Sequence, residues 1–171
     1  MTAFGFLCTG GSAYAARPDS TPAVRVQIVL NSTRTVAGRS IKGAAILTNL
    51  TDTRLTVEDC AADGWLEVGL VSSDITFEPI NLGIACPPSV YLAPGRNRFP
   101  FTISTRYQMC LQRDGKATAR IPRCASARRG RTDNVEPPLP AGLYLTKVVV
   151  TGLPPGSEVA KAISIRLLSK S

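Results

Sequence analysis

The sequence predicts an all-β protein built from antiparallel hairpins. Three phrases each set a glycine turn before a run of β-branched and aromatic residues, a pattern typical of hairpin-linked strands. The 14 glycines and 13 prolines among 171 residues suit many short strands joined by tight turns. Helix-length amphipathic patterns are hard to find. The three phrases are Val36–Leu50, Tyr91–Phe101 and Leu139–Val149.

Alternation of apolar and polar residues places the strands in order along the chain. Val24–Leu30 alternates and then becomes continuously apolar, which predicts an outer first strand. In the second predicted strand, Ile41–Leu47, we expect Ile41, Ala45 and Leu47 to face the core. The other predicted strands are Arg54–Glu58, Trp65–Val71, Ile75–Ile80, Arg98–Ser104, Leu143–Val150 and Ala162–Leu168.

The N-terminal residues carry the pattern of an export signal. A short apolar run, Ala3–Cys8, precedes Ala13–Ala15, which matches the small-x-small sequence that signal peptidase reads. The run is too short to span a bilayer, so no transmembrane segment is expected. We expect residues 1–16 to be a signal peptide, residues 17–171 to form one domain, and the protein to be secreted or held in the cell envelope. An unstructured N-terminal tail is the alternative.

The cysteines support export. One of the five, Cys8, lies inside the predicted signal, which leaves an even number in the domain. Four cysteines permit three pairings, and we favour the one in which each disulfide brackets a hairpin-sized excursion. A four-cysteine zinc site is the alternative, but the chain has no Cys-x-x-Cys pair. The favoured disulfides join Cys60 with Cys86 and Cys110 with Cys124, and Trp65 is expected to pack in the core beside Cys60.

Positive charge concentrates in one long loop at residues 105–141. Eight basic and three acidic residues give this loop +5 of the chain's formal +8. One interpretation is a solvated loop kept soluble by its charge. The other is contact with an anionic surface or envelope polymer; nucleic acid is not expected, because aromatic residues are not interleaved with the basic ones. The candidate contact residues are Arg120, Arg123, Arg128, Arg129 and Arg131.

The absence of histidine restricts the chemistry that this chain can perform. It removes the commonest general base near neutral pH and excludes Ser-His-Asp and Cys-His sites. No phosphate-binding loop, dinucleotide fingerprint or Gly-x-Ser-x-Gly elbow occurs. Glu58, Asp59 and Asp63 cluster, but without the spacing of a calcium loop. We therefore expect no catalytic activity, no cofactor and no metal.

The turn phrases resemble those of bacterial immunoglobulin-like β-sandwich modules. They are AGRSIKGAAILTN at 37–49, LAPGRNRFPF at 92–101 and PAGLY at 140–144. They are similar to phrases of the BsuPI type of proteinase-inhibitor domain, and the cysteine layout is similar to that of uncharacterised secreted proteins of actinobacteria. The resemblance spans Val24–Leu168. It implies an immunoglobulin-like antiparallel β-sandwich with one long disulfide-braced loop, and it carries over no reactive-site residue.

Two functions follow as expectations. The first is a non-catalytic, exported immunoglobulin-like binding or structural module of the bacterial cell envelope that contacts a protein or an anionic surface. The alternative is a secreted protease inhibitor that presents the disulfide-braced segment Leu111–Arg123. In that case Lys116 or Arg120 would enter a trypsin-like pocket.

Overall fold

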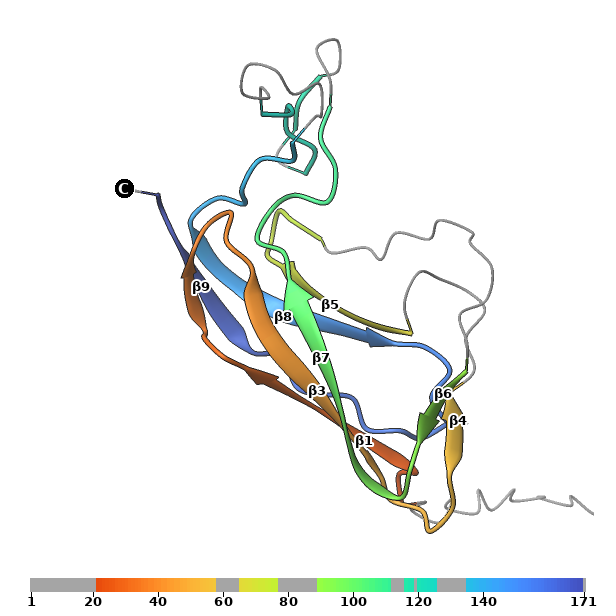
Figure 1. Cartoon of the computed structure of the whole chain (residues 1–171). Coiled ribbons are helices and arrows are strands. Elements are labelled where there is room, and N and C mark those ends of the chain that lie inside the picture. Colours follow the sequence, from red (N-terminus) through yellow and green to blue (C-terminus); the bar gives the residue numbers. More distant parts are fainter. Residues whose placement is uncertain are drawn as a thin grey trace, which may run out of the picture.

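The computed structural model describes residues 21–57, 65–76, 89–111, 116–118, 120–125 and 135–170, and these residues form nine strands and no helix (Figure 1). The predicted all-β class is confirmed. The strands are β1 (Val24–Leu30), β2 (Arg34–Val36), β3 (Ile41–Asn49), β4 (Leu55–Val57), β5 (Leu66–Val71), β6 (Val90–Leu92), β7 (Gly95–Ile103), β8 (Gly142–Val150) and β9 (Ser164–Leu168).

Two larger sheets pack face to face as the layers of a β-sandwich. One has the strand order β1-β3-β7 and the other β2-β9-β8-β5, while β4 and β6 form a small two-stranded sheet. All pairs are antiparallel except β2 with β9, which is parallel. In Figure 1 the layer of β1, β3 and β7 crosses in front of β8, β9 and β5.

The core fills the space between the layers. In one cluster Ile41 and Ile103 from the first sheet meet Ile165 and Leu167 from the second, and all four are 3% exposed or less. A second cluster joins residues of β1 and β3 to Val57 and Leu92 of the small sheet. The expected inward residues of the second predicted strand are confirmed: Ile41, Ala45 and Leu47 are buried.

Most predicted strands are confirmed with small changes at their ends. The exception is the segment predicted at Ile75–Ile80, because Ile75 and Thr76 follow β5 without strand pairing and residues 77–80 lie outside the described residues. Trp65 is half-buried, and its ring meets Phe99 edge to face with the centroids 4.6 Å apart. Its expected neighbour Cys60 lies outside the described residues, as do Cys86 and the predicted signal at 1–16.

Thr105 joins the first and third glycine phrases. Its hydroxyl accepts a hydrogen bond from Gly38 N (2.8 Å) and donates one to Arg39 O (2.6 Å). Its carbonyl oxygen accepts a hydrogen bond from Leu139 N at 2.9 Å. Gly38 has φ +88°, which favours glycine. Because Thr105 is 1% exposed, these bonds are shielded from water and hold two turns that lie far apart in the sequence.

Two further side chains fix turns at the ends of the sandwich. Asn49 is buried, and its Nδ2 donates to Thr53 O (2.7 Å) and Leu92 O (3.1 Å). These bonds tie the turn after β3 to the small sheet. At the start of β8, the buried Tyr144 donates its hydroxyl to Pro140 O at 2.9 Å. This bond fixes the path along which the chain enters β8.

Candidate functional site

A groove of about 670 Å³ opens between the two larger sheets. It lies between β5 and β7, which are the end strands of their sheets in the described part of the chain. Five consecutive residues of β5, 66–70, line it. Side chains alternate between the two faces of a strand, so a run of consecutive lining residues means that the edge of β5 itself borders the groove.

The hydrogen-bond ladder between β5 and β8 determines which backbone groups of β5 lie at this free edge. Trp65 O accepts a hydrogen bond from Thr151 N at 3.0 Å, in line with the register of the two strands. Hydrogen-bonded pairs recur at every second residue of an antiparallel ladder. Every second residue of β5 therefore bonds to β8, and the residues between them direct their N–H and C=O groups away from β8 to the groove. Those residues are Leu66, Val68 and Leu70.

The opposite edge, on β7, is open in the same way. Asn31 N donates to Lys42 O at 3.0 Å, so the even-numbered residues of β3 bond to β1 and its odd-numbered residues bond to β7. Pro100 and Thr102 consequently direct their backbones to the free edge. Proline has no N–H, but at this outward position no bond to β3 requires one, so Pro100 breaks no ladder bond. Of the two, only Thr102 offers an N–H to the groove.

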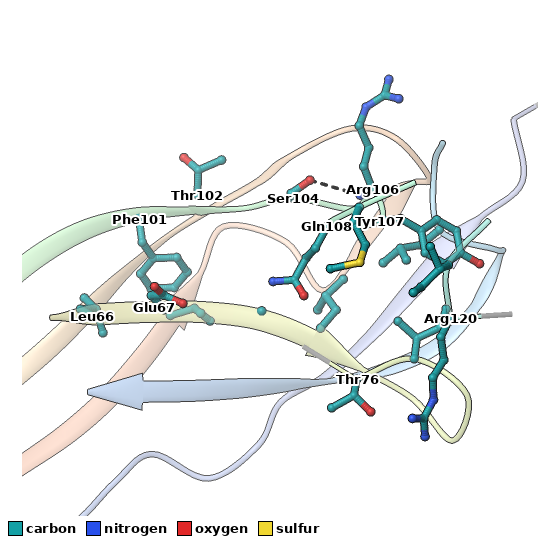
Figure 2. Close-up of a pocket in the computed structure, with 17 residues that line it drawn as sticks. Leu66, Glu67, Thr76, Phe101, Thr102, Ser104, Arg106, Tyr107, Gln108 and Arg120 are labelled. Carbon is teal, nitrogen blue, oxygen red and sulfur yellow. Dashed lines mark hydrogen bonds between the residues drawn. The ribbon is translucent and has the colours of Figure 1, made fainter. Parts of the chain in front are cut away.

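Apolar side chains form the walls and floor of the groove. Phe101 lies over Gly43 so closely that a Cβ on Gly43 would lie 2.7 Å from the Phe101 ring. The glycine thus lets the Phe101 ring settle at the groove, where Figure 2 shows it above β5. Ile75 lies at the same opening, and Met109 keeps 54% of its surface exposed. The interior therefore suits apolar groups.

Glu67 of β5 lies beside Phe101 (Figure 2), and other polar side chains lie at the margin of the groove. Figure 2 shows Gln108 beside the opening, while the guanidinium groups of Arg106 and Arg120 point away from it on opposite sides. Arg106 Nη1 donates to Glu136 O at 2.7 Å, so this arginine holds two parts of the long loop together.

A disulfide braces the segment that follows β7. Cys110 and Cys124 are joined with an S–S distance of 2.08 Å, which confirms one predicted pair. Leu111 N donates to Pro122 O (2.8 Å), and Cys124 N donates to Leu111 O (2.9 Å). Figure 1 shows this segment projecting beyond one end of the sheets. The loop is therefore tied down at the point where it meets the groove.

The predicted basic contact residues do not gather into one cluster among the described residues. Arg120 lies at the margin of the groove, and Arg123 is exposed beside the disulfide in a backbone bridge with Leu111. Arg128, Arg129 and Arg131 lie outside the described residues. The sequence did not indicate the groove, because its walls come from segments about 30 to 70 residues apart whose only local signal is strand alternation.

Two tyrosines near the groove resist ionisation. Burial raises the pKa of Tyr107 above its ordinary value of 10.0. Burial also raises the pKa of Tyr144, and the nearby Tyr107 and Asp74 raise it further. Both phenols are therefore neutral at physiological pH, and the Tyr144 hydroxyl serves as the donor to Pro140 O.

Within the described residues, no three His, Cys, Asp or Glu side chains lie close enough together to hold a metal ion. The same residues include no helix with the length and apolar character needed to cross a membrane. Compared with known proteins, the chain matches no protein-family model, no curated protein and no solved structure.

Proposed function

We propose that this protein is a non-catalytic, extracytoplasmic binding module with an immunoglobulin-like sandwich, and that it holds an extended segment of a partner protein in the groove between β5 and β7. The observation that carries the proposal is the pair of strand edges, unpaired within the described part of the chain, on either side of an apolar opening of about 670 Å³. Extended peptides bind such edges by adding a strand to the sheet.

Two features support the immunoglobulin-like assignment. The chain passes from one sheet to the other between β1 and β2, and β2 then pairs in parallel with the last strand. Tyr144 bonds through its hydroxyl to the backbone four residues upstream, at Pro140 O, as in the tyrosine corner of immunoglobulin domains. The disulfide between Cys110 and Cys124 is compatible with an oxidising compartment outside the cytoplasm.

The groove defines the chemistry of the expected segment. Backbone groups of Leu66, Val68 and Leu70 would bond to the main chain of the added strand, which gives affinity without sequence preference. Side chains of that strand alternate in direction. Every second side chain would then enter the apolar interior beside Phe101 and Met109. We therefore expect segments with apolar residues at alternate positions.

Selection from a displayed library of random short peptides tests the proposal. The expected result is enrichment of peptides with apolar residues at every second position. Hydrogen exchange of the complex should then show new protection at the amides of Val68 and Leu70, whereas the amide of Gly69, already bonded to β8, should change little. The proposal is wrong if the free protein protects all of these amides equally, or if the selected peptides protect amides elsewhere.

A variant at the other edge separates the two sides of the groove. Thr102 is exposed and directs its N–H to the groove, so Thr102→Pro removes one donor from β7 without altering the core. Peptides bound along β5 should keep their affinity for this variant. A large loss of peptide affinity would show that the added strand pairs with β7 instead of β5.

The protease-inhibitor function is a second candidate, favoured by the braced loop. The disulfide spans a sequence separation of 14 residues, and Lys116 within it is exposed. Thr118 and Ile121 bond to each other through Thr118 N to Ile121 O at 2.9 Å, which stiffens the end of the loop. Titration of trypsin should show inhibition that Lys116→Ala abolishes and Lys161→Ala, at another exposed lysine, does not. Simple digestion of the native protein excludes this function.

A further inference from the structure

The outer face of the β2-β9-β8-β5 sheet carries an unusual set of side chains. Tyr144 and Thr146 of β8 are buried, as are Ile165 and Leu167 of β9. Since side chains alternate along a strand, the residues between them point outward. The outward residues are Leu143, Leu145 and Lys147 of β8 and Ser164 and Arg166 of β9.

Two leucines are exposed on this face at the start of β8. Leu143 is 62% exposed, and Leu145 is 45% exposed although it has register partners on both sides. Val71 lies opposite Leu145 in the register and adds to the same apolar area. The water-facing side of an antiparallel sheet is normally polar. Contiguous apolar area on such a face marks an interaction site.

Two arginines lie side by side next to these leucines. Arg34 of β2 and Arg166 of β9 are register partners on parallel strands, and Leu143 is the register partner of Arg166 on the other side. Both arginines are exposed, and neither is in an ion pair with another described residue. Like charges placed directly opposite each other destabilise a sheet. An anion that bridges the two guanidinium groups would remove this repulsion.

The acidic residue of this sheet lies away from the two arginines. The strands β2, β8 and β9 contain no Asp or Glu, and Glu67 of β5, on the same face as Val71, lies opposite Val149, two strands away from Arg166. A second copy of the chain would place cations against cations, and the formal charge of +8 opposes such a pairing. A surface complementary to both the arginines and the leucines presents phosphate groups directly beside apolar chains. It also carries no cations of its own that would repel the arginines.

We propose that this face binds the surface of an anionic phospholipid bilayer. Arg34 and Arg166 contact lipid phosphates, and Leu143 and Leu145 enter the boundary between head groups and acyl chains, as interfacial apolar side chains do. The site lies on a different face from the groove. The inference goes beyond the proposed function and holds or fails independently of it.

Sedimentation of the full chain with vesicles tests the inference. The protein should bind phosphatidylglycerol vesicles, bind phosphatidylcholine vesicles far more weakly, and lose binding as the salt concentration rises. Arg34→Glu with Arg166→Glu should lower the partition coefficient by about tenfold or more. Leu143→Asn with Leu145→Asn should lower it by about tenfold.

Matched controls lie on the outer face of the other sheet. Val29 is 53% exposed there, and Arg96 and Arg98 are exposed beside each other on β7. Val29→Asn, and Arg96→Glu with Arg98→Glu, should leave binding within about twofold of the native protein. Equal losses in both sets would show attraction spread over the whole basic surface and would overturn the inference. Binding to neutral vesicles with equal strength, or no binding to anionic vesicles, overturns it as well.

A measurement on the native protein tests the inference even if the variants fail to fold. Oxidative footprinting with and without phosphatidylglycerol vesicles should show protection of Leu143 and Leu145, while Val29 stays as reactive as in the free protein. Protection of Val29 instead would place the contact on the opposite face. If vesicles do not bind and a selected acidic protein protects Leu143, the face is a protein interface and the bilayer inference is wrong.

Discussion

The two sides of the sandwich differ in how the sheets meet. On one side the chain itself joins them, because β1 belongs to the first sheet and β2, only a few residues later, belongs to the second. On the other side the described strands β5 and β7 border a groove, and their outer edges lack partners among the described residues.

This difference determines where a peptide could add to the edge of a sheet. On the joined side, the passage of the chain from β1 to β2 closes the space between the sheets, and side chains such as Ile165 are buried there. On the open side, the backbone groups of Val68 and Leu70 face the groove, so a partner can bond to them without breaking bonds of the fold. Substitutions on the two sides should therefore have different consequences, and four of them test the contrast.

The largest expected effect comes from a cavity in the core. Ile165 is fully buried, so Ile165→Ala should lower the free energy of unfolding by about 2–5 kcal/mol. Met109→Ala at the groove should cost less than about 0.5 kcal/mol, because Met109 is 54% exposed. Urea unfolding measures both. Similar losses for the two variants would contradict the assignment of Met109 to an open groove.

Removal of the confirmed disulfide should have the next largest effect. Its cysteines are separated by 14 residues, and a loop of that size contributes about 3 kcal/mol in the chain-entropy description. Cys110→Ser with Cys124→Ser should lower the urea midpoint by a corresponding amount and should weaken peptide binding in the groove. Unchanged peptide affinity would show that the braced segment is not part of the site.

Loss of the Thr105 hydroxyl tests the link between the two turns. Thr105→Val preserves the side-chain shape but removes the hydroxyl that bonds to Gly38 N and Arg39 O, and it leaves Gly38 N only the longer bond to Thr105 O at 3.3 Å. The expected cost is about 1–3 kcal/mol. Thr105→Ser retains the hydroxyl and should recover most of this loss. A small loss for Thr105→Val together with a large loss for Thr105→Ser would mean that the methyl group, not the hydroxyl, matters at this site.

Tyr144 gives the smallest effect and a dependence on pH. Tyr144→Phe removes the bond to Pro140 O and should cost about 1 kcal/mol at neutral pH. Because the pKa of Tyr144 is raised in the fold, the unfolded chain releases the phenol proton first as the pH rises above 10.0. Stability is therefore full below that pH and falls as the pH rises toward the folded pKa. The melting temperature, measured across this pH range, should fall less steeply with rising pH for Tyr144→Phe than for the native protein.

Local patterns were sufficient for the strands that alternate over many residues. Val24–Leu30 was predicted with the bounds that the structure has, because one face of this strand meets the core and the other meets water. The strand β2 was not predicted, since three residues are too few for a period and their partner β9 lies more than a hundred residues away. The apolar outer face at Leu143 was also missed, because apolar residues in a strand were expected to face the core.

Part of the candidate site could be predicted from the sequence. The pairing of Cys110 with Cys124 followed from their spacing, and both close one excursion of the chain. The role of Arg106 did not follow, because its partner, Glu136 O, is a backbone atom that any residue would supply. Charge alone drew attention to the arginines after Cys124, whereas the groove depends on apolar walls that carry no such local mark.

The all-β class, most strand positions and one disulfide follow from local patterns in the sequence, because alternation, glycine turns and cysteine spacing are local properties of the chain. Which of the described strands end their sheets, and therefore where the groove lies, depends on the tertiary structure. It also brought Arg34 beside Arg166 and placed Thr105 between two distant turns. These features depend on the register and order of strands that are far apart in the sequence, which only the packing of the two sheets against one core can select.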